Sequence, residues 1–118
     1  MAETLLYQGV AVNPANGSRL RLGHNVETLA GAKTLTPQDA QFQALDPDGE
    51  ARDVILPAEE VSQGLWFVIK NTAGGAENLV IEDDGGSGVL TIANLECTMV
   101  VCDGSSWISL GVVIFAVS

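Results

Sequence analysis

Few residues in this chain of 118 are of the types that carry catalytic chemistry. The single histidine, His24, lies between a glycine and an asparagine. A general base needs an oriented partner within hydrogen-bond reach, and the residues around His24 suggest none. We therefore interpret His24 as an ordinary turn residue.

The two cysteines, Cys97 and Cys102, are five residues apart. Side chains alternate between the two faces of a strand, so this spacing points the thiols to opposite sides and predicts no disulfide between them. We interpret them as small buried hydrophobic residues. The sequence has no Cys-x-x-Cys pair, no phosphate-binding Gly-rich loop and no Gly-x-Ser-x-Gly turn. We expect a protein that is not an enzyme and has no catalytic residue, metal or cofactor.

Two clusters of acidic residues could in principle bind a hard cation such as calcium, which takes several carboxylate and carbonyl oxygens. Neither cluster has the spacing of a known calcium loop. We interpret both as turn residues with solvated charge, and calcium binding stays the alternative. The clusters are Asp46, Asp48, Glu50 and Asp53, and then Glu82, Asp83 and Asp84.

Trp107 is the aromatic residue best placed to contact a ligand, because it follows the turn-forming residues 103–106. An exposed tryptophan at the end of a hairpin could form part of a sugar-binding surface. A tryptophan that packs over the end of a sheet would instead be structural. The sequence leaves both interpretations of Trp107 open.

The chain is acidic, with five Lys and Arg against fifteen Asp and Glu and a net charge of −10. Nucleic acids and anionic membranes attract cations, so neither is an expected partner. No apolar run reaches the roughly 20 residues of a membrane helix. The N-terminus also lacks the basic and then apolar pattern of a signal peptide, so we expect the protein to be made in, and to stay in, a cytoplasm.

The charge is unevenly distributed along the chain. Residues 1–38 hold three cations, Arg19, Arg21 and Lys33, against two acids, for a net charge of +1. Residues 39–118 hold two cations against thirteen acids, for a net charge of −11. This asymmetry indicates two surfaces with different partners, although chance could produce it in a chain with so few cations.

Short apolar runs separated by Gly, Asn, Asp and Pro are typical of strands and turns. We predict an all-β fold, a β-sandwich or jelly roll of about 8–10 short antiparallel strands over residues 31–118. Residues 1–30 are predicted to form an N-terminal arm or hairpin, all within one compact domain. Residues 65–70 are apolar on both faces, which predicts a central strand covered on both sides. Other strands are predicted at residues 41–45, 52–56, 78–82, 89–93, 96–102 and 106–110, with one helical turn within 57–64.

The C-terminal run is apolar on both faces, and an exposed edge of this kind would favour aggregation. Hydrophobic residues make up 47% of the chain and charged residues only 17%, so partners are expected to cover part of the apolar surface. The run is therefore either an internal strand of the monomer or an oligomer interface. The interface residues would be Val112, Val113, Ile114, Phe115 and Val117.

The order of several short motifs resembles that of structural proteins of tailed bacteriophages, particularly capsid decoration (cement) and head-fibre proteins. The resemblance covers about two thirds of the chain, residues 33–110. It is carried by Leu56-Pro57, by Phe67-x-Ile69-x-Asn71 and by Asp103-Gly104-x-x-Trp107.

The resemblance implies an all-β protein, often a homotrimer, that sits on the outer capsid of the virion and clamps the major capsid protein. It brings no catalytic residue. An arm carrying Arg19, Arg21 and Lys33 would then contact the capsid, and the apolar C-terminal run would form the oligomer interface. The alternative function is that of a tail-fibre or head-fibre domain that recognises host-surface glycan, with Trp107 as a contact.

Overall fold

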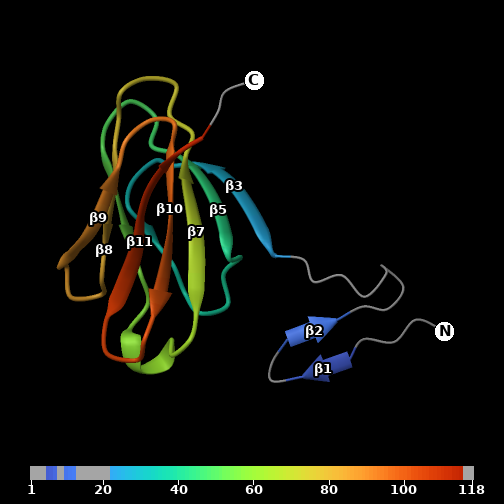
Figure 1. Ribbon diagram of the computed structural model, residues 1–118. Coiled ribbons are helices and arrows are strands. Elements are labelled where there is room, and N and C mark those ends of the chain that lie inside the picture. The colour runs from blue at the N-terminus through green and yellow to red at the C-terminus, as the bar shows by residue number, and fades with distance from the viewer. Residues whose placement is uncertain (1–4, 8–9, 13–21, 116–118) are drawn as a thin grey trace.

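The computed structural model describes residues 5–7, 10–12 and 22–115 (Figure 1). Strands β1 (Leu5–Tyr7) and β2 (Val10–Val12) pair antiparallel and belong to neither of the two larger sheets. This pair lies within residues 1–30, the range predicted as an N-terminal arm or hairpin. The five-stranded sheet already begins at His24, inside the range 1–30 that was predicted as an arm.

The remaining strands form two sheets packed face to face. The first sheet has the order β11-β10-β7-β5-β3 and the second has the order β4-β6-β8-β9. The strands of the first sheet are β3 (His24–Thr28), β5 (Phe42–Asp46), β7 (Trp66–Asn71), β10 (Glu96–Cys102) and β11 (Trp107–Ile114). Those of the second are β4 (Lys33–Thr34), β6 (Arg52–Ile55), β8 (Leu79–Glu82) and β9 (Gly88–Ile92). The prediction of an all-β fold is confirmed.

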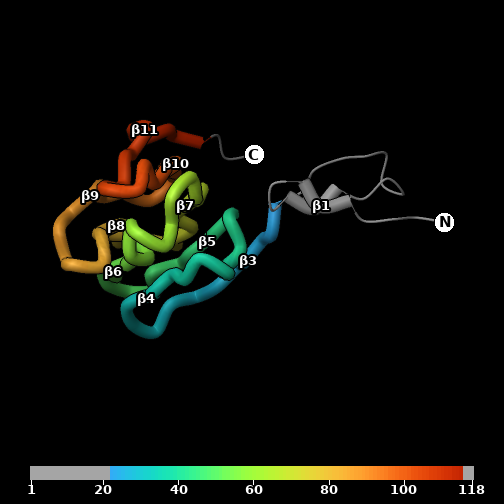
Figure 2. The backbone as a smooth tube through the Cα atoms, turned by 90° about the horizontal axis from the view of Figure 1, so that it is seen from below, coloured from blue at the N-terminus to red at the C-terminus, as the bar shows by residue number. Residues whose placement is uncertain are grey.

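From β3 to β8 the chain alternates between the two sheets, one strand in each (Figure 2). Each return to a sheet runs in the same direction as before, so β3–β5, β5–β7, β4–β6 and β6–β8 are parallel pairs. The prediction that the strands are antiparallel is therefore wrong for this half of the fold. Turn residues mark where a strand ends, but they do not say in which sheet the next strand lies. The architecture is a sandwich of two mixed sheets.

The strands that follow β8 in the chain all pair antiparallel with their neighbours. Strand β9 pairs with β8, β10 pairs with the central strand β7, and β11 pairs with β10. Residues predicted as two strands, 106–110 and the start of the C-terminal run, form the single strand β11. The helical turn predicted within 57–64 is a 3₁₀ turn at Glu59–Val61, and Gly64 follows it with a φ of +78°.

The hydrophobic core lies between the two sheets. Phe67 and Ile69 of β7 and Leu79 and Ile81 of β8 are fully buried there. Buried and half-buried residues alternate along both strands, because successive side chains of a strand point to opposite faces of the sheet. The remaining core residues are Leu29, Leu35, Leu45, Val54, Leu56, Ile92, Val100, Cys102 and Trp107.

Candidate interaction surface

The surface of the five-stranded sheet that faces away from the core is largely apolar. Directly paired residues of neighbouring strands point to the same face of a sheet, so the strand register identifies the members of this surface. We call this set the outer face. Its members are His24, Val26, Phe42, Ala44, Trp66, Val68, Lys70, Cys97, Met99, Val101, Ile108, Leu110 and Val113.

These residues form three rows across the strands. One row joins Val113 to Cys97, Lys70, Ala44 and Val26. The middle row joins Met99, Val68, Phe42 and His24, and Leu110 lies opposite Met99 at a bulge in β11. The third row joins Ile108, Val101 and Trp66. The rows are continuous, so the apolar side chains are neighbours and not scattered.

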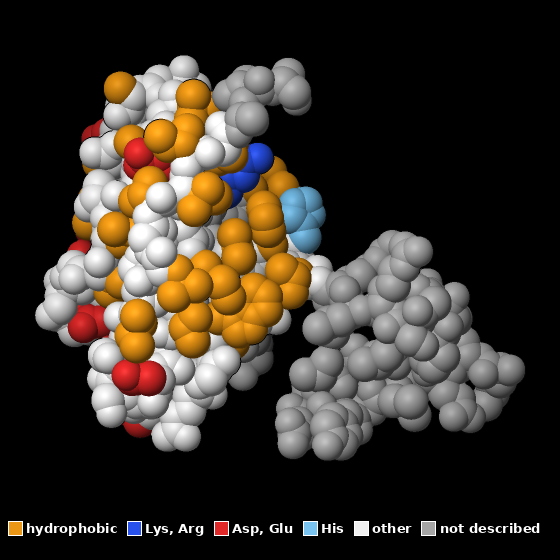
Figure 3. Space-filling view, in the orientation of Figure 1, with side chains coloured by type: hydrophobic (Ala, Val, Ile, Leu, Met, Phe, Trp, Pro, Cys, Tyr) orange, Lys and Arg blue, Asp and Glu red, His pale blue; other side chains and the backbone are white. Residues whose placement is uncertain are grey.

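The borders of the outer face are the most exposed. Val26 on β3 is 68% exposed, and Leu110 and Val113 on β11 are 64% and 60% exposed. Figure 3 shows hydrophobic side chains gathered over this side of the sandwich, with the single histidine at its border. Isolated surface hydrophobics are normal, but a contiguous apolar patch of this kind marks an interaction site.

The outer face carries almost no charge. No carboxylate belongs to its three rows; Asp46 lies beyond them, at the end of β5. Its one lysine, Lys70, places its Nζ 4.5 Å from the centre of the Phe115 ring, a cation–π contact. The His24 ring packs edge-on against Phe42 with 5.4 Å between ring centres. Both polar side chains are therefore combined with aromatic rings on an otherwise apolar surface.

The outward side of the four-stranded sheet differs in character. Asp53 pairs with Val80, and Ile55 pairs with Glu82, so carboxylates and aliphatic side chains alternate there. Thr91 lies opposite Val80 on the other side. This alternation of polar and apolar residues is typical of a solvated sheet surface. Of the two sheets, the five-stranded one has the more apolar outward face.

Among the described residues, strand β11 is also an open edge, because β10 is its one neighbour in the sheet. Its residues Val112 and Ile114 are 41% and 74% exposed. The C-terminal run is thus not an internal strand of the monomer, which was one of the two alternatives. Gly111 has a φ of +98° at the bulge, and Thr98 Oγ1 donates a 2.7 Å hydrogen bond to its carbonyl oxygen.

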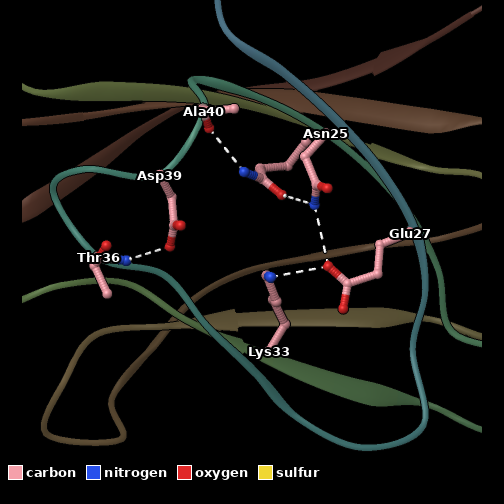
Figure 4. Close-up of polar contacts among 7 residues, drawn as sticks. Asn25, Glu27, Lys33, Thr36, Asp39 and Ala40 are labelled. Atoms are coloured by element: carbon pink, nitrogen blue, oxygen red, sulfur yellow. Dashed lines mark hydrogen bonds and ion pairs between the residues drawn. The ribbon is translucent and has the colours of Figure 1, made fainter.

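Of the three residues predicted to contact a capsid, the structure describes Lys33 alone. Arg19, Arg21 and the interface candidate Val117 lie outside the described residues. Lys33 donates a 2.8 Å hydrogen bond to Glu27 Oε1, so an intramolecular partner already balances its charge (Figure 4). The Lys33 ammonium, followed by the Asn25 amide, holds the pKa of Glu27 below its usual value.

The Lys33–Glu27 pair belongs to a polar network that joins β3 to β4 and β5 (Figure 4). Asn25 Nδ2 donates to Gln43 Oε1 at 2.8 Å, and Gln43 Nε2 donates to the Ala40 carbonyl oxygen at 2.8 Å. Gln43 is 1% exposed, so these bonds satisfy a buried amide. The network therefore joins strands β3, β4 and β5 through hydrogen bonds between side chains.

Trp107 is buried, with 7% of its surface exposed. Its Nε1 donates a 2.8 Å hydrogen bond to the Pro57 carbonyl oxygen, and its ring lies 5.9 Å from that of Phe67. The interpretation of Trp107 as a ligand contact is therefore wrong. The indole packs over one end of the core, which was the structural alternative.

The hydrogen bonds of Asp83 agree with the interpretation of the acidic residues as turn residues. Asp83 Oδ1 accepts the backbone N–H groups of Gly85 and Ser87 at 3.0 and 2.8 Å. Glu50 pairs with Arg52. Within residues 22–115, no group of three or more His, Cys, Asp and Glu side chains is placed to hold a metal ion.

The cysteines lie on opposite faces of β10, as their spacing predicts. Cys97 is a half-buried member of the outer face and Cys102 is buried in the core, and both are free thiols. The interpretation of both as buried residues therefore holds for Cys102 alone. The outer face itself was not identified from the sequence. The available signal was that residues 65–70 are apolar on both faces, from which this strand was predicted to be covered on both sides.

Comparisons with protein-family models, with curated proteins and with solved structures gave no match to this chain. In the part of the chain that the structure describes, no helix is long and apolar enough to span a membrane.

Proposed function

We propose that this protein is a structural component of a virion, a capsid decoration or cement protein that binds the outside of an assembled phage head. The observation that carries the proposal is the outer face, an apolar and carboxylate-free sheet surface on an otherwise acidic molecule. Such a surface suits permanent contact with another protein. The resemblance of residues 33–110 to decoration proteins supplies the choice of partner, the major capsid protein.

A cement protein stabilises a shell by mass action. If it binds the assembled lattice more tightly than it binds free capsid subunits, binding shifts the equilibrium toward the intact particle. Many copies act on each shell, so a modest free energy from each copy is sufficient. The acidic body would then face solvent, and the net positive segment 1–38 would supply contacts to the capsid.

The direct test is to mix purified protein with bare phage heads and measure co-sedimentation and the temperature at which the heads disassemble. We expect saturable binding and a higher disassembly temperature. Absence of both would contradict the proposal.

A finer test addresses the arm. The double variant Arg19→Glu, Arg21→Glu should lower occupancy on the heads, because it reverses two charges in the segment expected to contact the capsid. The matched control Arg19→Lys, Arg21→Lys keeps the charge and should keep binding. Equal occupancy for both variants would remove the arm from the proposal.

The glycan-binding alternative loses its aromatic contact, because the Trp107 indole is buried and donates a hydrogen bond to the Pro57 carbonyl oxygen.

A further inference from the structure

We infer that the outer face is the contact surface for a second copy of this chain, packed sheet on sheet. The second copy would then occupy the outer face, and contact with a capsid would be left to the segment that carries Arg19 and Arg21. A monomeric protein that still binds phage heads would overturn this inference and leave the proposed function standing.

The surface needs a protein partner because it is wide and apolar. Five strands about 4.8 Å apart and three rows about 7 Å apart give a flat area of about 500 Å². Side-chain relief at the exposed borders, above all Val26, Leu110 and Val113, raises the accessible area beyond that figure. A standard protein interface buries about 800 Å² on each partner, so this face is at the small end of the range and suits a weak, reversible dimer.

Charge restricts the surface through which two copies of this acidic chain can meet. Residues 39–118 have a net charge of −11, so two copies repel one another unless their carboxylates lie away from the contact. The three rows of the outer face contain no carboxylate. The four-stranded sheet would bring Asp53 and Glu82 of one copy against acids of the other. The outer face is the sheet surface through which two acidic copies can meet.

The geometry of a sheet favours the same conclusion. Two sheets pack about 10 Å apart when their facing side chains interdigitate, and twisted sheets of the same hand pack well on each other. A face that contacts its own copy forms an isologous interface, which closes as a dimer. The inference therefore predicts two chains, in contrast to the homotrimer implied by the resemblance.

The first experiment measures mass. Sedimentation equilibrium and light scattering on the full-length chain should give twice the chain mass at high concentration, with dissociation at about micromolar concentration. A single-chain mass at every concentration overturns the inference, and so does a three-chain mass.

The second experiment places the contact. Val68 on β7 and Val80 on β8 are matched, because each is a half-buried valine on the outward side of a non-edge strand. Val68→Lys should raise the dissociation constant at least a hundredfold, and Val80→Lys should leave it within threefold. Should Val68→Lys fail to fold, Val26→Lys at the exposed border serves instead. Equal effects at both positions, or no effect at the outer face, overturn the inference.

The native thiols give an independent readout. Cys97 belongs to the outer face and Cys102 to the core. The rate at which maleimide modifies Cys97 should fall at least tenfold when the protein concentration is raised through the dimer midpoint. Cys102 should stay unreactive until the protein is unfolded, which confirms that the fold is intact. A Cys97 rate that does not change as the mass doubles would place the interface elsewhere.

Discussion

Trp107 Nε1 and the Pro57 carbonyl oxygen are 2.8 Å apart, although fifty residues separate them along the chain. Trp107 begins β11 in the five-stranded sheet, and Pro57 follows β6 in the four-stranded sheet. The hydrogen bond therefore links the two layers at one end of the core. It also explains why a tryptophan in a turn-rich segment is structural.

The first prediction concerns this link. Trp107→Ala should lower the free energy of unfolding by about 3–5 kcal/mol, because it removes a large core side chain and leaves the Pro57 carbonyl oxygen without its partner. Urea denaturation followed by circular dichroism measures the change. Trp107→Phe should cost less, since most of the packing is kept. A loss below 1 kcal/mol for the alanine variant would contradict the structural role of Trp107.

The second prediction concerns Asn71, which is fully buried. Its Nδ2 donates to the carbonyl oxygens of Glu77 and Ile92 at 3.0 Å each, and its Oδ1 accepts the Ala73 N–H at 2.9 Å. Because Ile92 ends β9, this side chain also joins the two sheets. Asn71→Ala should lower the free energy of unfolding by about 2–4 kcal/mol, since three backbone groups lose their partner and two of them are buried.

Asn78→Ala provides the comparison for Asn71, because Asn78 is half-buried in the same region. Thermal melts of both variants should show a clearly larger loss of Tm for Asn71→Ala. Similar losses would show that the three hydrogen bonds of Asn71 contribute little.

The third prediction concerns pH. The pKa of Glu27 is held below its ordinary value of 4.5, first by the hydrogen bond from Lys33 and then by that from Asn25. A carboxyl group with a lowered folded-state pKa stabilises the fold above its unfolded-state pKa, and this stabilisation is lost as the pH falls through the lowered value. The Glu27 side chain is 38% exposed, so solvent screens the pair and its contribution should be only about 0.5 kcal/mol.

A double-mutant cycle measures this contribution. Glu27→Gln, Lys33→Gln and the double variant should show a coupling of about 0.5 kcal/mol at pH 7 that disappears well below pH 4.5. A coupling that persists in acid would show that the contact is not ionic.

The fourth prediction concerns Gly111, whose φ of +98° produces the bulge in β11. A β-branched residue rarely adopts this conformation, so Gly111→Val should cost about 1–3 kcal/mol of stability. Bulges also disrupt edge strands and limit edge-to-edge pairing. If the strand straightens in this variant, light scattering should detect more aggregation than in the wild type. Gly74→Val, in a loop with open space around the glycine, is the control.

Local sequence patterns determined most of the strands. The alternation at residues 65–70 marked β7, the central strand, and residues 96–102 match β10 with no shift at either end. Strands β3 and β4 were missed, because His24-Asn25-Val26-Glu27-Thr28 is largely polar and β4 has only two residues. Both lie at sheet edges, where burial no longer imposes an apolar pattern.

Tertiary structure alone decided the sheet in which each strand lies, and therefore which residues form the outer face. A period of two shows that Val68 and Phe67 point to opposite sides, but not which of those sides another layer covers. The parallel pairs β3–β5 and β5–β7 bring Val26, Ala44 and Lys70 into one row from three separate segments. Pairings over such distances depend on the packing of the whole core, because no local signal distinguishes one sheet from the other. The apolar second side of β7 was visible in the sequence, and the fold determined that it forms part of a continuous outer face.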